Sequence, residues 1–221
     1  MKRWRGWFVV GLVGAAFIVV AHQAPSVCAD TCTSVSVVGV DTSQADHNSH
    51  VGVRCGEAPG ETFVATDTLV RSITVWRAAI ETPHDGGFKL WITKVDSAGI
   101  PQRDQAVLEG PVKYFPLGDG VHPIKMQFSF DPPFALPAPG RYFFAVQDYC
   151  GTTWDLLVNL EDAYPDGSLW RGAITCFDGC GYLGNPDIIT SWDLIFAIEF
   201  CKEIPTPVRT TSWGRLKTIY R

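Results

Sequence analysis

Turn-forming residues divide the middle of the chain, residues 30–201, into short runs, with a turn signal roughly every eight to twelve residues. These signals include the glycine and proline clusters at 85–87, 98–101, 118–120, 132–133 and 137–140. Glycine permits a positive φ, whereas proline fixes φ and removes a hydrogen-bond donor from a β-ladder. Regular spacing of this kind is typical of an all-β sandwich or barrel.

Large apolar residues recur at every second position inside these runs, which is the period of a β-strand. The clearest examples are 193–201 and 124–130. The runs 88–95 and 141–148 are apolar on both faces, so we predict that they lie centrally in a sheet. The segment 68–75 also carries a helical stripe of apolar residues, but its β-branched residues favour a strand. No repeat or Gly/Ser linker interrupts this region, so one domain is the simplest interpretation.

The first 29 residues have the three parts of a secretory signal peptide. Basic residues at 1–5 precede an apolar run of 16 residues at 6–21. An uncleaved N-terminal anchor is the alternative, but this run is shorter than the roughly 20 residues that cross a bilayer as a helix, which favours the signal peptide. Cleavage could follow Ala21, Ala24 or Ala29, and Ala29 best fits the preference for small residues before the cut.

The cysteine count supports cleavage after Ala29, because removing residues 1–29 leaves an even number. An even number in an exported chain predicts disulfides rather than free thiols. The close pair Cys176 and Cys180 could form a small loop, and the simplest further guess joins Cys32 to Cys55 and Cys150 to Cys201. The six predicted disulfide cysteines are Cys32, Cys55, Cys150, Cys176, Cys180 and Cys201.

Charge and composition exclude two classes of protein. The chain has a net charge of −5, which argues against a nucleic-acid-binding protein. Its hydrophobic content of 46% is too high for an intrinsically disordered chain.

The C-terminal residues 202–221 form a proline-containing linker followed by a short basic tail. In a helix, Trp213, Leu216 and Tyr220 would share one face. Three interpretations are open: an end that docks on the domain, a tag at 210–221 read by export or attachment machinery, or a helix on a membrane surface.

Two segments near the end of the domain carry a family resemblance. Residues 162–170 contain the turn sequence Tyr-Pro-Asp-Gly, and residues 191–198 contain the strand sequence Asp-Leu-Ile-Phe. Together with 61–63, 69–76 and 88–93, they resemble bacterial extracellular jelly-roll domains of the choice-of-anchor type. The resemblance covers about residues 60–200 and implies that the predicted domain, residues 30–201, is a single jelly-roll-like antiparallel β-sandwich, although six cysteines depart from the usual cysteine-poor pattern.

The sequence contains no motif of a serine hydrolase, a zinc protease or a nucleotide-binding loop, so we predict no catalytic residue. Acidic residues gather near the end of the domain, and Asp162 and Asp166 are candidate ligands of Ca²⁺, which prefers carboxylate and carbonyl oxygens. The alternative is a solvated acidic surface.

Aromatic residues suggest a second kind of site. Trp154, Trp170 and Tyr182 fall in or beside predicted loops, where exposed rings could stack on sugars. By contrast, Trp76, Trp91 and Trp192 lie within strand patterns and are predicted to pack in the core.

The sequence therefore favours a secreted or surface-attached binding or adhesion module, with a carbohydrate or another cell-surface molecule as its partner. One alternative is a small secreted glycan-active hydrolase with an acid pair from 148–193. The other is a structural envelope protein without a small ligand.

Overall fold

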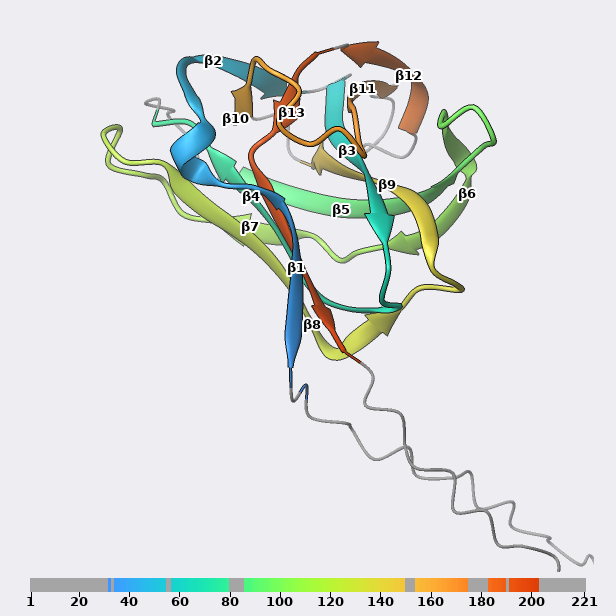
Figure 1. Ribbon diagram of the computed structural model, residues 1–221. Helices are drawn as coiled ribbons and strands as arrows, with labels where there is room; N and C mark the ends of the chain where they lie inside the picture. The colour runs from blue at the N-terminus through green and yellow to red at the C-terminus, as the bar shows by residue number, and fades with distance from the viewer. Residues whose placement is uncertain are drawn as a thin grey trace, which may run out of the picture. The chain divides into compact units, whose positions relative to one another are not determined.

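The computed structural model describes residues 32, 34–54, 57–79, 86–149, 154–174, 183–189 and 191–202 (Figure 1). These residues form an all-β sandwich of two antiparallel sheets, as predicted. The predicted signal peptide and the tail at 210–221 lie outside the described residues. A search of the described part of the chain finds no helix long and apolar enough to cross a membrane.

The first sheet, sheet A, joins the two ends of the domain. Its main path runs β1–β14–β4–β10–β13, while β2 pairs with β10 and β8 pairs with β4. A short 3-10 helix, Thr42–Gln44, follows β1 and is capped by Asp41. The strands are β1 (Val35–Val40), β2 (Asp46–Val53), β4 (Leu69–Arg77), β8 (Ile124–Ala135), β10 (Trp154–Asn159), β13 (Asp193–Leu194) and β14 (Phe196–Cys201).

The second sheet, sheet B, runs β12–β11–β3–β9–β5–β6, and β7 pairs with β5. The sheet is curled, so that strands β12 and β6 from its opposite ends come within 8 Å between Cα atoms. The strands are β3 (Glu57–Ala65), β5 (Gly86–Val95), β6 (Pro101–Glu109), β7 (Lys113–Phe115), β9 (Gly140–Asp148), β11 (Leu169–Ile174) and β12 (Leu183–Ile189).

The strand predictions are confirmed. The runs 88–95 and 141–148 belong to β5 and β9, which pair with each other inside sheet B. The segment 68–75 is strand β4, and it pairs with both β14 and β8. The run 193–201 forms β13 and β14, separated at Ile195, whose N–H donates to the carbonyl of Leu157. Two of the predicted turns are wrong, because 86–87 begins β5 and 132–133 lies inside β8.

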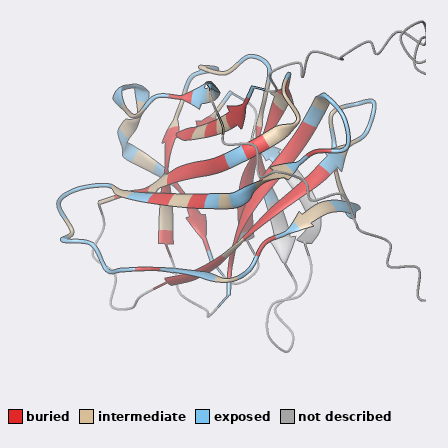
Figure 2. Ribbon diagram, turned by 90° about the horizontal axis from the view of Figure 1, so that it is seen from below, coloured by how far each residue is buried: buried red, intermediate tan, exposed pale blue. Residues whose placement is uncertain are grey.

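The main core lies between the two sheets, and buried residues follow the strands (Figure 2). Phenylalanine rings from both sheets meet there. The ring of Phe144 on β9 is 5.5 Å from that of Phe196 on β14, and Phe63 on β3 is 6.3 Å from Phe200. Contacts between sheets of this kind fix the sandwich, because aromatic side chains bury the most apolar area per residue.

A second apolar cluster lies on the other face of sheet B. Its members alternate along the strands with residues of the main core, so they point away from sheet A. One row across the sheet joins Trp170, Gly60, Ala145 and Trp91. A Cβ on Gly60 would lie only 1.9 Å from the carbonyl oxygen of Phe144, so the row requires glycine there. The cluster consists of Ala58, Trp91, Phe143, Ala145 and Trp170.

A disulfide joins Cys32 to Cys201, with 5.2 Å between their Cα atoms. The guesses that paired Cys32 with Cys55 and Cys150 with Cys201 are therefore wrong. The physical reason is the register of β1 on β14, in which Val35 lies opposite Cys201 and brings Cys32 close. The other four predicted cysteines lie outside the described residues.

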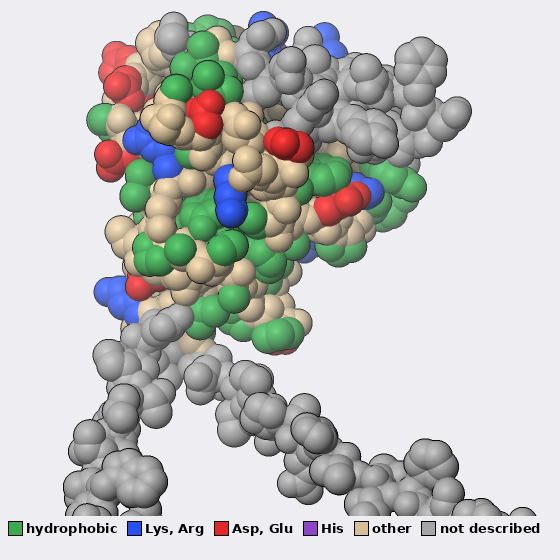
Figure 3. Space-filling model, turned by 90° about the vertical axis from the view of Figure 1, so that its right-hand side faces the viewer, with side chains coloured by type: hydrophobic (Ala, Val, Ile, Leu, Met, Phe, Trp, Pro, Cys, Tyr) green, Lys and Arg blue, Asp and Glu red, His purple; other side chains and the backbone are tan. Residues whose placement is uncertain are grey.

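Charged side chains are mixed on the face shown in Figure 3. Acidic and basic side chains lie among apolar ones, and the coloured part of this face has no broad area of one sign.

Candidate functional site

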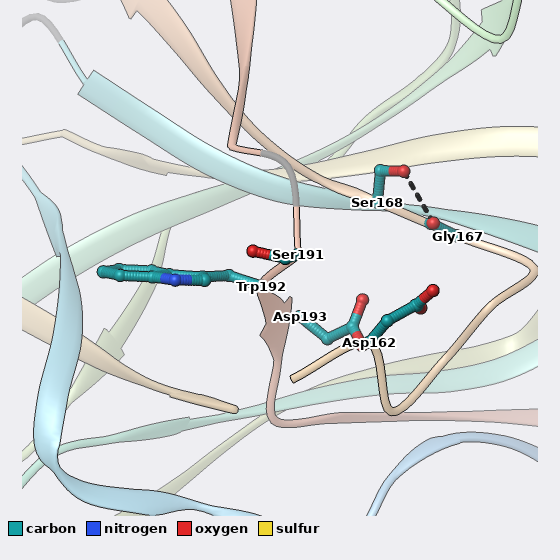
Figure 4. A pocket seen from close by; sticks show the side chains of 6 residues that line it. All are labelled: Asp162, Gly167, Ser168, Ser191, Trp192 and Asp193. Atoms are coloured by element: carbon teal, nitrogen blue, oxygen red, sulfur yellow. Dashed lines mark hydrogen bonds between the residues drawn. The ribbon is translucent and has the colours of Figure 1, made fainter. Parts of the chain in front are cut away.

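A small pocket of about 110 Å³ lies where two loops meet (Figure 4). Asp162, Gly167 and Ser168 come from the loop between β10 and β11. Ser191 and Trp192 come from the turn before β13, and Asp193 is the first residue of that strand. The lining is therefore mainly carboxyl and hydroxyl groups.

The β10–β11 loop is held against strand β3. The N–H of Gly167 donates to the carbonyl of Tyr164 at 2.9 Å and closes a turn. A Cβ on Gly167 would lie 2.2 Å from the carbonyl oxygen of Thr62, so only glycine permits this close approach. The N–H of Thr62 in turn donates to the carbonyl of Ser168 at 3.1 Å. One wall of the pocket is thus fixed by backbone contacts.

Asp193 connects the two loops through a hydrogen bond. Its Oδ2 accepts a hydrogen bond from the N–H of Tyr164 at 2.8 Å. The Tyr164 hydroxyl accepts from the N–H of Val64 at 3.1 Å, and its ring packs edge-on against Phe196 at 5.4 Å. Residues 162–170 and 191–198 therefore contact each other directly. Burial raises the pKa of Asp193, although backbone hydrogen bonds from Tyr164 and Ala163 oppose the shift.

A third carboxyl group, that of Glu61 on β3, lies next to the pocket residues. Glu61 is fully buried, and its Oε2 accepts from the N–H of Leu194 at 3.0 Å. No hydrogen-bond partner is found for its Oε1 among the described residues. Burial raises the pKa of Glu61 well above its usual value, and the nearby charges of Asp193 and Asp162 raise it further. The site therefore favours the protonated form of Glu61.

Figure 4 shows how the lining side chains are arranged around the pocket. The carboxyl groups of Asp162 and Asp193 lie beside each other, whereas the indole of Trp192 points away from them. Trp192 is partly buried and packs against the main core. The Ser168 hydroxyl donates to the carbonyl of Gly167 at 2.6 Å. The pocket thus offers oxygen atoms, rather than an aromatic face, to a ligand.

The predicted metal ligands fall in different places. Asp162 lines the pocket, but Asp166 lies in the neighbouring turn and is not among the lining residues. Within the described ranges, no group of three or more His, Cys, Asp or Glu side chains could hold a metal ion.

The prediction that Trp154 and Trp170 offer exposed rings is wrong. Trp154 is fully buried, with the ring of Phe88 at 4.7 Å and the guanidinium of Arg77 at 4.3 Å from its own ring. Trp170 is only 8% exposed and belongs to the second apolar cluster. Both residues lie in strands rather than loops, and strand geometry points them into packed layers. Tyr182 lies outside the described residues.

Sequence reasoning also placed Trp76, Trp91 and Trp192 in the core. Trp91 is buried, while Trp76 and Trp192 are partly buried and pack against the main core. Glu61 was not predicted as a site residue. The alternation pattern of β3 could have shown its burial, since Glu61 lies on the same inward face as Phe63 and Ala65.

Comparisons with protein-family models, with curated proteins and with solved structures find no match.

Proposed function

We propose that this protein is an exported binding module of the bacterial cell surface or surroundings, and that its pocket takes one residue of a carbohydrate. The observation that carries this proposal is the oxygen-rich pocket between two loops fixed on a rigid sandwich. Binding sites commonly lie on loops that a rigid scaffold positions. The disulfide between Cys32 and Cys201 is compatible with an oxidising extracellular environment.

The chemistry of the lining suits sugar hydroxyl groups. The carboxylate of Asp162 is exposed and accepts hydrogen bonds, and the hydroxyl of Ser191 is also at the surface. At about 110 Å³ the pocket is small, so we expect it to take the edge of one sugar ring rather than a longer chain.

The test uses Asp162→Asn, which removes a charged hydrogen-bond acceptor. We expect this variant to lose about tenfold in affinity for a sugar that the wild-type protein binds, because hydrogen bonds to charged groups contribute roughly 1.5–3 kcal/mol. The measurement is a titration with a panel of monosaccharides and short oligosaccharides, followed by NMR or calorimetry. Asp166→Asn is the matched control, because Asp166 is exposed and close in sequence but does not line the pocket. Equal loss in both variants would contradict the assignment of the pocket.

A hydrolase is the second candidate, and the raised pKa values of Glu61 and Asp193 are the observation that favours it. A general acid must keep its proton near the working pH, which burial can achieve. However, Glu61 is fully buried and already accepts a hydrogen bond from Leu194. Release of reducing sugar from a polysaccharide, abolished by Asp193→Asn, would replace the binding proposal with this one. The binding proposal expects no release.

A further inference from the structure

Two tyrosines flank a glycine in one row across sheet B. Tyr114 on β7 lies opposite Gly87 on β5. On the other side, the N–H of Tyr149 donates to the carbonyl of Gly87 at 2.8 Å, one residue beyond the pair Phe88 and Asp148. Directly opposed residues of an antiparallel ladder point to the same face. At a strand spacing of ~4.8 Å, the two tyrosine backbones are about 10 Å apart.

This row lies on the outer face of the sheet. The next residue of β5, Phe88, is fully buried in the main core, and so is Phe115, which follows Tyr114. Side chains alternate along strands, so Tyr114 points away from the core. Its exposed fraction is 64%, and that of Tyr149 is 37%. Two exposed aromatic rings in one row make a small apolar surface of a size that one sugar ring can cover.

Gly87 provides a bare backbone surface for one of the rings. A Cβ at this position would lie 2.8 Å from Cε1 of Tyr114 and 3.2 Å from Cγ1 of Val112. The Tyr114 ring therefore rests directly against Gly87, with much of its surface in solvent. The absence of a side chain at Gly87 thus leaves room for the Tyr114 ring.

The surroundings favour a neutral polar ligand. Lys89 forms an ion pair with Glu109 at 2.8 Å, and its Nζ is 5.5 Å from the centre of the Tyr149 ring. Lys113 lies opposite the inward-facing Phe88 and donates to the carbonyl of Gln127 at 2.6 Å, so it belongs to the other face of the sheet. Lys89, the lysine beside the row, is thus paired and does not present a free positive charge to an anion. Aromatic faces beside paired polar groups match a sugar ring, which has an apolar face and a polar rim.

We propose that Tyr114, Gly87 and Tyr149, here called the tyrosine platform, bind the apolar face of a sugar ring in a neutral polysaccharide. This inference rests on the proposed carbohydrate-binding function and adds a second contact area to it. The platform shares no residue with the pocket lined by Asp162 and Asp193.

The experiment compares Tyr114→Ala and Tyr149→Ala with the wild-type protein. The probes are insoluble cellulose, chitin and xylan in pull-down assays, and the corresponding soluble hexasaccharides in titrations. Val121→Ala is the matched control, because Val121 is 71% exposed in the nearby β7–β8 loop and lies outside the row. Unchanged thermal unfolding shows that each variant is folded. We expect each tyrosine variant to lose roughly tenfold in affinity, as for other exposed aromatic contacts, while the control binds normally.

Each other outcome has a distinct meaning. If the wild-type protein binds a polysaccharide and only Asp162→Asn loses affinity, the platform is overturned and the proposed function stands. If the tyrosine variants lose affinity but Asp162→Asn does not, the platform stands and the pocket assignment fails. If no probe binds, both are overturned. Binding to phosphatidylglycerol vesicles that Tyr114→Ala abolishes, without polysaccharide binding, would replace the sugar with a membrane surface.

Discussion

The two faces of sheet B carry similar apolar side chains but differ in what covers them. The inner face packs against sheet A, and its rings, such as Phe63 and Phe144, are fully buried. On the outer face, Trp91 and Phe143 are buried where the sheet curls, whereas Tyr114 and Tyr149 are exposed. Strand alternation therefore assigns a residue to a face but does not decide whether that face is covered. Aromatic residues on the inner face therefore stabilise the core, whereas Tyr114 and Tyr149 are largely in contact with solvent.

Phe144→Ala on the inner face is the strongest test of this difference between the two faces. Phe144 lies between Phe63 and Phe196, at 6.2 and 5.5 Å between ring centres. We expect a loss of about 3–5 kcal/mol in the free energy of unfolding, because the substitution leaves a cavity in a packed core. Denaturant unfolding measures it. Tyr114→Ala should change stability by less than about 0.5 kcal/mol, and similar losses at both positions would contradict the distinction.

A second prediction concerns sheet A, where a covalent bond joins the chain before β1 to the end of β14. In the double variant Cys32→Ser, Cys201→Ser, the free energy of unfolding should fall by about 2–5 kcal/mol. The reason is that the disulfide closes a loop with a sequence separation of 169 residues. Thermal unfolding of the two proteins under oxidising conditions gives the difference. An identical transition in both would show that hydrogen bonds and packing alone hold β1 in place.

The outer cluster can be tested with a smaller change. The Nε1 of Trp91 donates to Oε1 of Gln147 at 2.5 Å, and both residues are buried. Trp91→Phe should therefore lower the free energy of unfolding by about 1–3 kcal/mol, because it removes the donor to a buried acceptor. Trp170→Phe is the matched control, since no hydrogen-bond partner is found for its Nε1 among the described residues. If Trp170→Phe lowers the free energy of unfolding as much as Trp91→Phe does, the hydrogen bond is not what stabilises the cluster.

The smallest expected effect is a change in pH dependence from Glu61→Gln. The pKa of Glu61 is raised by folding, so the folded protein binds the proton more tightly than the unfolded chain. The resulting stability is fully present below the usual pKa of about 4.5 and is lost as the pH rises toward the folded value. Asp193, whose pKa is also raised, contributes with the same sign.

We therefore expect the melting temperature of the wild-type protein to fall by a few degrees across this range, and that of Glu61→Gln to fall less. The slope against pH is the readout, because a glutamine in the buried site could shift the melting temperature at every pH. Equal slopes would show that Glu61 titrates normally. Asp162→Asn is a useful comparison, since Asp162 is exposed and acts on Glu61 only through its charge.

Much of the fold could be predicted because strand signals are local. Alternation at 193–201 and apolar runs at 88–95 and 141–148 correctly located strands and their central position. The site could be predicted only in part. Asp162 was found, but Trp154 and Trp170 were assigned to the surface, because sequence position near a loop does not reveal which layer covers a ring. Glu61 was missed as a site residue for the same reason, as its burial depends on strands distant in the chain.

The sequence by itself determined that the domain is all-β and where most of its strands lie, since turn residues and period-two patterns act over a few neighbours. Only the tertiary structure decided the partner of Cys32, the meeting of Asp162 with Asp193, and the row of Tyr114, Gly87 and Tyr149. Each of these depends on which strands pair and in what register. Register is fixed by packing of the whole sandwich, because a shift of one residue would exchange the two faces of a strand.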